Sequence, residues 1–257
     1  MLAELAVGDS HALSAFPPPL LAPAAVLTDQ IEHHVGHLRR DRITDRASPA
    51  QRTTDGRVRK CKLRSPVADS GVLAEGKDVT IRRMRDHLDD YRLLLRWRSA
   101  PHVAEWWDTA QTELGLEGVI AKYVSRTRSE DPTTACIIQL TGLPIGYIQF
   151  YPWEDNEAEM REIGFRLPAR YWGVDIFIGE RDHLDRGFGS QAVSLIHRYL
   201  VEQRGAAGVA LVVARDNVRA QRAYEKAGLV RICEVLDTDT RAGQRIPSYL
   251  MACPPTP

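Results

Sequence analysis

The stretch "HLDRGFGSQAV", residues 183–193, has the pattern of a glycine-containing loop that leads into a helix. Gly187 and Gly189 stand one residue apart, behind Arg186 and ahead of a run with a helical pattern. Glycines at such a point let a ligand approach the backbone closely. A helix N-terminus presents free N–H groups to an anion. We therefore expect this loop to hold a phosphate or pyrophosphate, with a purely structural tight turn as the alternative.

Three kinds of phosphate-binding loop are to be compared with this stretch. A P-loop requires GxxxxGK[ST], which the sequence lacks. A Rossmann fingerprint requires a third glycine in the first βαβ unit, whereas Ala192 stands at that position and the stretch comes late in the chain. The third candidate is the pyrophosphate of coenzyme A. The two glycines alone support it only weakly.

Regular patterns surround the glycine loop from residue 77 onward. Alternating or continuous apolar runs predict strands over residues 78–84, 134–140, 145–151, 172–179, 208–214, 229–236 and 246–252. Helical periodicity predicts helices over residues 87–107 with a break near Pro101, and over 112–129, 189–203 and 217–228. This order predicts a mixed α/β sheet with helices on both faces. We assign residues 77–257 to this one domain.

Residues 1–76 are interpreted as a low-complexity, disordered N-terminal extension. The segment 37–64 holds ten Lys/Arg against three Asp and offers little apolar surface for a core. It has no interleaved aromatic residues, so a solvated tail is favoured over a nucleic-acid contact. His33, His34 and His37 lie close together but have no fourth ligand at suitable spacing, so no metal site is expected.

Composition narrows the function classes further. The chain has 34 basic and 34 acidic residues, so its charge does not indicate a nucleic-acid or anionic-membrane partner. Four cysteines (Cys61, Cys136, Cys233 and Cys253) show no short spacing and are expected to be reduced thiols. No apolar run reaches the ~18 residues of a membrane span, and the N-terminus lacks the basic leader of a secretory signal. We expect a cytoplasmic protein, a monomer or homodimer.

A second segment, "DNVRAQRAYEKAGL" at residues 216–229, strengthens the coenzyme interpretation. Paired with "DRGFGSQAV", it closely resembles the GNAT superfamily of acyl-CoA N-acyltransferases. The family consensus Q/R-x-x-G-x-G/A falls on residues 184–189, with Leu184 departing from it at the Q/R position. The family pattern N-x-x-A-x-x-x-Y-x-K-x-G is matched at Asn217, Ala220, Tyr224, Lys226 and Gly228.

The resemblance covers about residues 77–253 and implies a GNAT fold, whose central, mostly antiparallel sheet has splayed middle strands. It implies acetyl-CoA as the acyl donor. It also implies that backbone N–H groups around Phe177 and Ile178 polarise the thioester carbonyl. The coenzyme-binding residues carried over are Phe177, Ile178, Arg186, Gly187, Phe188, Gly189, Ser190, Asn217, Ala220 and Lys226.

A narrower resemblance concerns the acceptor. The segments "EWW" (105–107), "PIGYIQFY" (144–151) and "GVDIFIGERDHLDRGFG" (173–189) look like the aminoglycoside 6'-N-acetyltransferases. The aspartate that those enzymes use as a base, or to orient the substrate amine, carries over to Asp175. The same pattern also resembles siderophore-biosynthesis lysine N-acyltransferases, which acylate another small amine. A non-catalytic acyl-CoA sensor is the alternative from another class.

The chemistry of acyl transfer tests these assignments. It needs an unprotonated amine, a polarised carbonyl and a proton for the departing thiolate. Asp175 is an acid in the apolar run "VDIFI" and is the candidate base, with a satisfied structural aspartate as the alternative. Glu180 is the fallback base. Tyr224 is the candidate acid, unless it only packs against the sheet.

Acidic and aromatic residues indicate the acceptor class. The segment 152–162 holds five acids and one arginine, and if it lines the cleft the substrate is polycationic. A solvated acidic loop is the alternative. Asp237 and Asp239 precede the last hairpin turn, and Tyr151 shares a strand face with two of the candidates. The candidate substrate-binding residues are Trp106, Trp107, Asp108, Tyr147, Gln149, Glu154 and Asp155.

Overall fold

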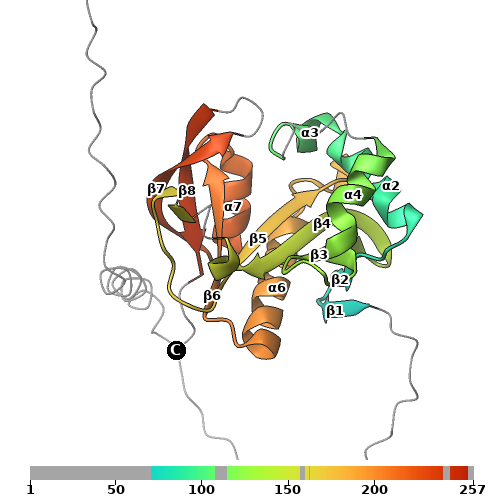
Figure 1. Cartoon of the computed structure of the whole chain (residues 1–257), viewed down its shortest axis with the longest axis horizontal. Helices are drawn as coiled ribbons and strands as arrows, with labels where there is room; N and C mark the ends of the chain where they lie inside the picture. The colour runs from blue at the N-terminus through green and yellow to red at the C-terminus, as the bar shows by residue number, and fades with distance from the viewer. Residues whose placement is uncertain (1–70, 108–114, 157–159, 162, 240–243, 254–257) are drawn as a thin grey trace, which may run out of the picture.

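An eight-stranded mixed sheet forms the centre of the protein, which is described here from a computed structural model (Figure 1). The structure describes residues 71–107, 115–156, 160–161, 163–239 and 244–253. The strand order is β1-β2-β3-β4-β5-β6-β8-β7. All neighbouring strands are antiparallel except β5 and β6, which are parallel. The expected mixed sheet is confirmed.

The element bounds follow the predicted patterns closely. The strands are β1 (Val72–Glu75), β2 (Val79–Arg83), β3 (Thr134–Leu140), β4 (Leu143–Pro152), β5 (Tyr171–Ile178), β6 (Gly208–Ala214), β7 (Val230–Asp239) and β8 (Gln244–Ala252). The helices are α2 (Leu88–Arg98), α3 (Pro101–Ala104), α4 (Leu116–Thr127), α6 (Phe188–Arg204) and α7 (Val218–Lys226), with short 3-10 turns η1 (Trp153–Asp155) and η2 (Arg181–His183).

The sheet begins earlier than the expected domain boundary. β1 pairs antiparallel with β2, so residues 72–75 belong to the domain and not to the N-terminal extension. This strand has four residues, and none of them is fully buried. It therefore carries too little hydrophobic alternation to be recognised in the sequence. Residues 1–70, including the basic segment and the histidine cluster, lie outside the described residues.

Alternating side chains give the sheet two buried faces. On one face, Cys136, Ile148 and Val174 pack with residues of α6 and α7. On the other, the neighbouring residues Ile137 and Tyr147 pack with α2 and α4. Helices therefore cover both faces, as the sequence predicts. In Figure 1, α6 and α7 lie apart from the α2–α4 group, with β4 and β5 between them.

The two middle strands separate along their length. β5 and β6 pair only from Tyr171 to Gly173, opposite Gly208 to Ala210. Beyond that point β6 continues to pair with β8, as far as Ala214. Neighbouring strand residues direct their N–H groups to opposite sides, so alternate N–H groups over residues 174–178 face the gap between β5 and β6. The splayed sheet that the GNAT resemblance implies is thus present.

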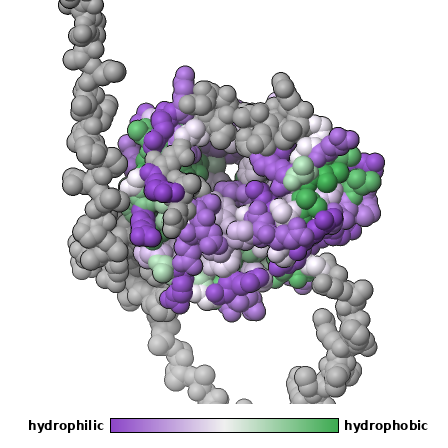
Figure 2. Space-filling model, in the orientation of Figure 1, coloured by the Kyte–Doolittle hydropathy of each residue, from purple (hydrophilic) through white to green (hydrophobic). Residues whose placement is uncertain are grey.

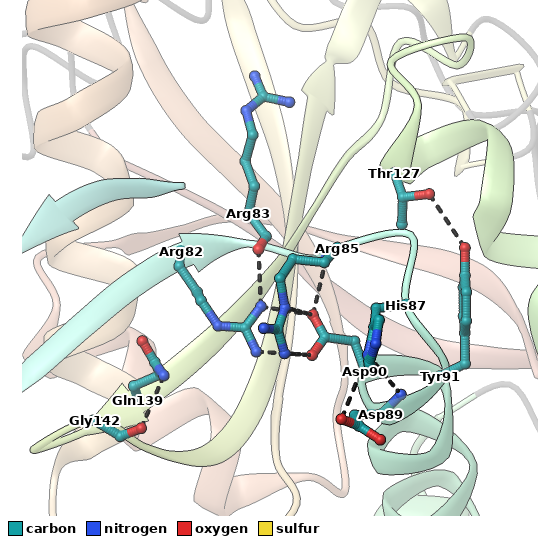
Figure 3. A network of polar contacts seen from close by, with 10 residues as sticks. All are labelled: Arg82, Arg83, Arg85, His87, Asp89, Asp90, Tyr91, Thr127, Gln139 and Gly142. Atoms are coloured by element: carbon teal, nitrogen blue, oxygen red, sulfur yellow. Dashed lines mark hydrogen bonds and ion pairs between the residues drawn. The ribbon is translucent and has the colours of Figure 1, made fainter. Parts of the chain in front are cut away.

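A buried ion cluster fixes the start of α2 against β2 (Figure 3). The Asp90 carboxylate is fully buried and accepts hydrogen bonds from Arg82 Nη1 at 2.6 Å and Nη2 at 2.9 Å. It also accepts from the Arg85 backbone N–H at 2.8 Å and from Arg85 Nη2 at 2.7 Å. These bonds hold the pKa of Asp90 at about 2, although desolvation by burial opposes them.

Within the described ranges, every helix is too short or too polar to cross a bilayer.

Candidate active site

A cavity of about 940 Å³ opens where β5 and β6 diverge. Residues 174–178 line one wall and residues 212–214 line the opposite wall. The space-filling view shows a small opening near the centre of this face of the molecule (Figure 2). This volume falls within the range of roughly 300–1,000 Å³ that is usual for small-molecule sites. The divergence of two strands thus creates the site.

The glycine loop and the N-terminus of α6 form one end of the cavity. Gly187 is the N-cap residue in the left-handed conformation, with φ of 82°, and no side chain caps the helix. A Cβ atom added at Gly187 would meet nothing within 4 Å, and one added at Gly189 would meet only Ile178 Cγ1 at 4.0 Å. Free N–H groups and open space beside them fit a pyrophosphate.

Arg186 takes a different position from its neighbours in this loop. Its guanidinium lies over the Phe188 ring, 5.3 Å from the ring centroid. The other residues from 187 to 190 line the cavity, whereas Arg186 does not. A contact of its side chain with a bound coenzyme would require it to leave this ring.

α7 brings its own residues to the same end of the cavity. The Asn217 side chain accepts a hydrogen bond from Ala220 N–H at 3.1 Å, which confirms the predicted N-cap. That bond commits the Asn217 amide oxygen to the helix. Ala220, Tyr224 and Lys226 follow on the helix and line the cavity.

A residue of the neighbouring strand β4 holds the Asp175 side chain by a hydrogen bond. Asp175 lies opposite Gln149 in the β4–β5 register, and Gln149 Nε2 donates to Asp175 Oδ2 at 2.7 Å. Burial raises the pKa of Asp175 above its ordinary value, and the nearby Asp237 carboxylate adds to the increase. The bonds from Gln149 and Tyr151 and the charge of Arg126 act against it. A carboxylate with a raised pKa is better suited to accept a proton near neutral pH.

Tyr224 reaches the cavity from the opposite face of the sheet. Burial raises the pKa of its hydroxyl above the ordinary value, and the Asp175 carboxylate raises it further. The hydroxyl therefore stays protonated at neutral pH. The gap between β5 and β6 brings one carboxylate and one phenol into the same cavity, so a proton acceptor and a proton donor face the same space.

Aromatic and charged residues also line the cavity. Trp107 packs edge-on against Phe177, with ring centroids 4.8 Å apart. Trp106 lines the cavity and is 36% exposed. Asp237 on β7 lines the cavity as well. These side chains form a mixed aromatic and anionic surface near Asp175.

Most of the part of the chain that forms the cavity matches a known protein family. The family profile described as "Acetyltransferase (GNAT) domain" matches residues 86–236, more than half of the chain. The protein is a GNAT acetyltransferase. The loop, the splayed strands and the cavity all lie within or beside this matched region.

Individual relatives of this GNAT domain act on different amines. The chain is 29% identical over 167 residues to aminoglycoside N(6')-acetyltransferase type 1 of Klebsiella pneumoniae, covering 62% of this chain and 78% of that protein. It is 24% identical over 152 residues to N-hydroxyputrescine acetyltransferase of Acinetobacter baumannii, covering 56% and 68%. The crystal structure of aminoglycoside acetyltransferase AAC(6')-Ib with coenzyme A and kanamycin is 26% identical, with a TM-score of 0.55 over 68% of this chain and 93% of that one.

Several predicted residues of the GNAT domain lie away from the cavity surface. Tyr147 is fully buried and stacks on Phe177. Glu154 and Asp155 are exposed on η1 and are not among the cavity-lining residues. The reason is the strand register: the end of β4 at Pro152 pairs with Trp172, at the closed end of the splay.

Glu180, the fallback base, is committed to other partners. It accepts a hydrogen bond from Trp97 Nε1 at 2.7 Å and forms an ion pair with Arg96. It does not line the cavity. Among the predicted acceptor contacts, Asp108 lies outside the described residues, as do residues 157–159 and 162 of the acidic segment. Asp239 ends β7.

α4 contributes cavity residues that the sequence did not reveal. Lys122, Tyr123 and Arg126 line the cavity. Lys122 and Arg126 are four residues apart and so lie on one face of the helix. In a sequence, such a charged pair is usually interpreted as a solvated helix face, and only the packing of α4 on the sheet turns it toward the site.

Proposed function

We propose that this protein transfers the acetyl group of acetyl-CoA to the 6'-amine of an aminoglycoside. The observation that carries the proposal is the meeting of Asp175, Tyr224 and the open N-terminus of α6 in one cavity. The aminoglycoside acetyltransferases among the relatives support the acceptor class. When bound, acetyl-CoA supplies an activated thioester carbonyl.

Residues of this chain bind the coenzyme, polarise the carbonyl and transfer the protons. The N–H groups at Gly187–Ser190 hold the pyrophosphate, and N–H groups of β5 that face the splay polarise the carbonyl. Asp175 takes a proton from the acceptor ammonium, which frees the nitrogen lone pair for attack. As the C–N bond forms and the C–S bond breaks, Tyr224 gives its proton to the thiolate, and the new amide nitrogen releases its second proton to water. Asp175 and Tyr224 are restored by exchange with solvent.

The polycationic acceptor meets two carboxylates and two indoles. Asp175 binds the reacting amine, Asp237 binds a second ammonium group, and the sugar rings lie against Trp106 and Trp107. Salt screens such pairs, so we expect the Michaelis constant of the drug to rise with ionic strength. Because Lys122 and Arg126 line the same side, the acceptor must place its other ammonium groups away from α4.

A smaller amine is the second candidate acceptor. The cations of α4 favour an acceptor with fewer positive charges than an aminoglycoside carries. The similarity to N-hydroxyputrescine acetyltransferase supports the same choice. This candidate shares Asp175, Tyr224 and the coenzyme site, and differs only in what fills the acceptor side.

One assay separates the two acceptors. Thiol release from acetyl-CoA is measured with kanamycin, with an analogue bearing a 6'-hydroxyl, with polyamines and with N-hydroxylysine. We expect turnover with kanamycin and none with the 6'-hydroxyl analogue. Equal turnover with both drugs would place the acetyl group on another amine. Turnover with the small amines alone would replace the aminoglycoside by the second candidate.

We also propose that the reaction takes place in the cytoplasm, in a monomer or homodimer that needs no nucleic acid. The balanced charge of 34 basic and 34 acidic residues supports the absence of a nucleic-acid partner. The three cysteines that the structure describes, Cys136, Cys233 and Cys253, are free thiols, which suits a reducing compartment. Size-exclusion chromatography with light scattering tests the oligomeric state.

A further inference from the structure

The Gln149 amide connects Asp175 to α4. Its oxygen accepts hydrogen bonds from Arg126 Nη1 at 2.7 Å and from the Tyr147 hydroxyl at 2.8 Å. An amide oxygen has two lone pairs, and both are occupied here. The nitrogen end must therefore face Asp175, to which it donates at 2.7 Å. The two donors to the amide oxygen thus orient the amide so that its nitrogen donates to Asp175.

The Arg126 side chain packs on its own helix and lies near one carboxylate. Its guanidinium lies over the Tyr123 ring, 5.2 Å from the centroid, and the side chain is 19% exposed. Its carboxylate contact is Asp131, with Nε and Oδ2 3.9 Å apart. That separation is too long for a hydrogen bond, and within the described part of the chain Nε has no hydrogen-bond partner. Much of the positive charge is therefore left to act on the cavity.

We propose that Arg126 is a positioning residue, which acts through Gln149 to fix the Asp175 carboxylate and keep it ionised until the acceptor amine arrives. The proposal rests on the proposed function of Asp175 as the base. Because Gln149 donates to Oδ2, the orientation of the carboxylate depends on the orientation of the Gln149 amide. Arg126 would thus set both the geometry and the charge of the base without touching the reacting atoms.

The charged and titratable groups around Asp175 come from four elements. Arg126 acts from α4, Asp237 from β7, Tyr151 from β4 and Tyr224 from α7. Arg126 is the cation in this set, and it opposes the effects of burial and of Asp237 on the pKa of Asp175. Without its charge, we expect the pKa of Asp175 to rise further. The ionised base would then be lost at a higher pH.

Two substitutions separate charge from geometry. Arg126→Met removes the charge but keeps a long side chain beside Tyr123, whereas Arg126→Lys keeps the charge and loses the planar fork. Arg128→Met is the matched control, because Arg128 lies at the end of the same helix, is exposed and pairs with Asp86. The pKa of Asp175 is measured by carboxyl NMR, assigned with Asp175→Asn, together with the pH profile of kcat/KM.

We expect Arg126→Met to raise the pKa of Asp175 and to move the acidic limb of kcat/KM to higher pH. Its turnover at the plateau should fall by about tenfold to a hundredfold, the scale of a misplaced catalytic group. Arg126→Lys should keep the limb near its wild-type position and lose only plateau turnover. Acetyl-CoA affinity and the Arg128→Met profile should match wild type.

An unchanged Asp175 titration in Arg126→Met would overturn the proposal, as would an unchanged plateau in both variants. If Arg126→Met does not fold, wild-type kcat of Arg126→Lys across the pH range would likewise overturn the proposal. Failure of the proposed function gives a different result. The wild-type protein would then acetylate no amine, while the NMR titration would still report whether Arg126 acts on Asp175.

Discussion

Replacing Asp90 by Asn should strongly destabilise the protein, although Asp90 does not line the cavity. The carboxylate is fully buried and accepts bonds from Arg82 and Arg85 (Figure 3). Asparagine keeps the shape but has only one oxygen and no charge. Arg82, whose side chain is 9% exposed, would be left without its counter-ion.

The expected magnitude follows from the pKa. A pKa of about 2 for Asp90 in place of the usual 3.8 corresponds to about 2.5 kcal/mol of folding free energy when the group is ionised. Removing one partner of a buried pair costs about 3–5 kcal/mol, because the remaining charge stays buried. Asp90→Asn should therefore lower the free energy of unfolding by about 3–5 kcal/mol at pH 7.

The pH dependence has a definite sign. Because folding lowers the pKa of Asp90, its contribution is complete above the unfolded-state pKa of about 4 and is lost as the pH falls toward about 2. The difference between wild type and Asp90→Asn should therefore shrink by about 1 kcal/mol between pH 7 and pH 3.

Urea unfolding at both pH values measures this difference. Asp89→Asn is the matched control, since Asp89 is the neighbouring acid of α2, has a 65% exposed side chain, and has only exposed partners, His87 at 3.4 Å and Arg92 at 3.8 Å. It should cost less than about 1 kcal/mol. A loss below 1 kcal/mol for Asp90→Asn at pH 7, or a difference that widens toward pH 3, would refute the reasoning.

Two further predictions concern the coenzyme and the leaving group. Gly189→Asp should raise the Michaelis constant of acetyl-CoA by at least about tenfold, because the side chain enters open space beside free N–H groups and brings a negative charge there. Gly189→Ala tests the added volume alone. An unchanged Michaelis constant in both variants would mean that this loop does not bind the pyrophosphate. Tyr224→Phe should lower kcat by roughly 10²-fold, the lower end for a lost general acid, without loss of thermal stability; wild-type kcat would leave protonation of the thiolate to water.

Most of the fold could be predicted from the sequence because its elements carry strong patterns. β5 and β6 are apolar runs, α6 follows a glycine loop, and Asn217 begins α7 at an N-cap position. β1 could not be predicted, because four partly exposed residues give no alternation. Its place in the sheet depends on pairing with β2.

The site was only partly predictable, since it depends on contacts between distant segments. Asp175 is conspicuous as an acid in an apolar strand, but its bond to Gln149 follows from the β4–β5 register. Arg126 is hidden in the sequence because a cation on a helix usually faces solvent. Glu180 was a plausible base until the fold paired it with Arg96 and Trp97, more than eighty residues earlier in the chain.

The acetyl-transfer account depends most on Asp175, and one comparison tests it most directly. Thiol release from acetyl-CoA with kanamycin is measured for wild type and for Asp175→Asn in parallel, over a range of pH and of acetyl-CoA concentration. The account predicts that wild type turns over and that Asp175→Asn loses roughly 10²–10⁴-fold in kcat, with an unchanged Michaelis constant for acetyl-CoA. Full turnover by Asp175→Asn across the pH range would contradict it.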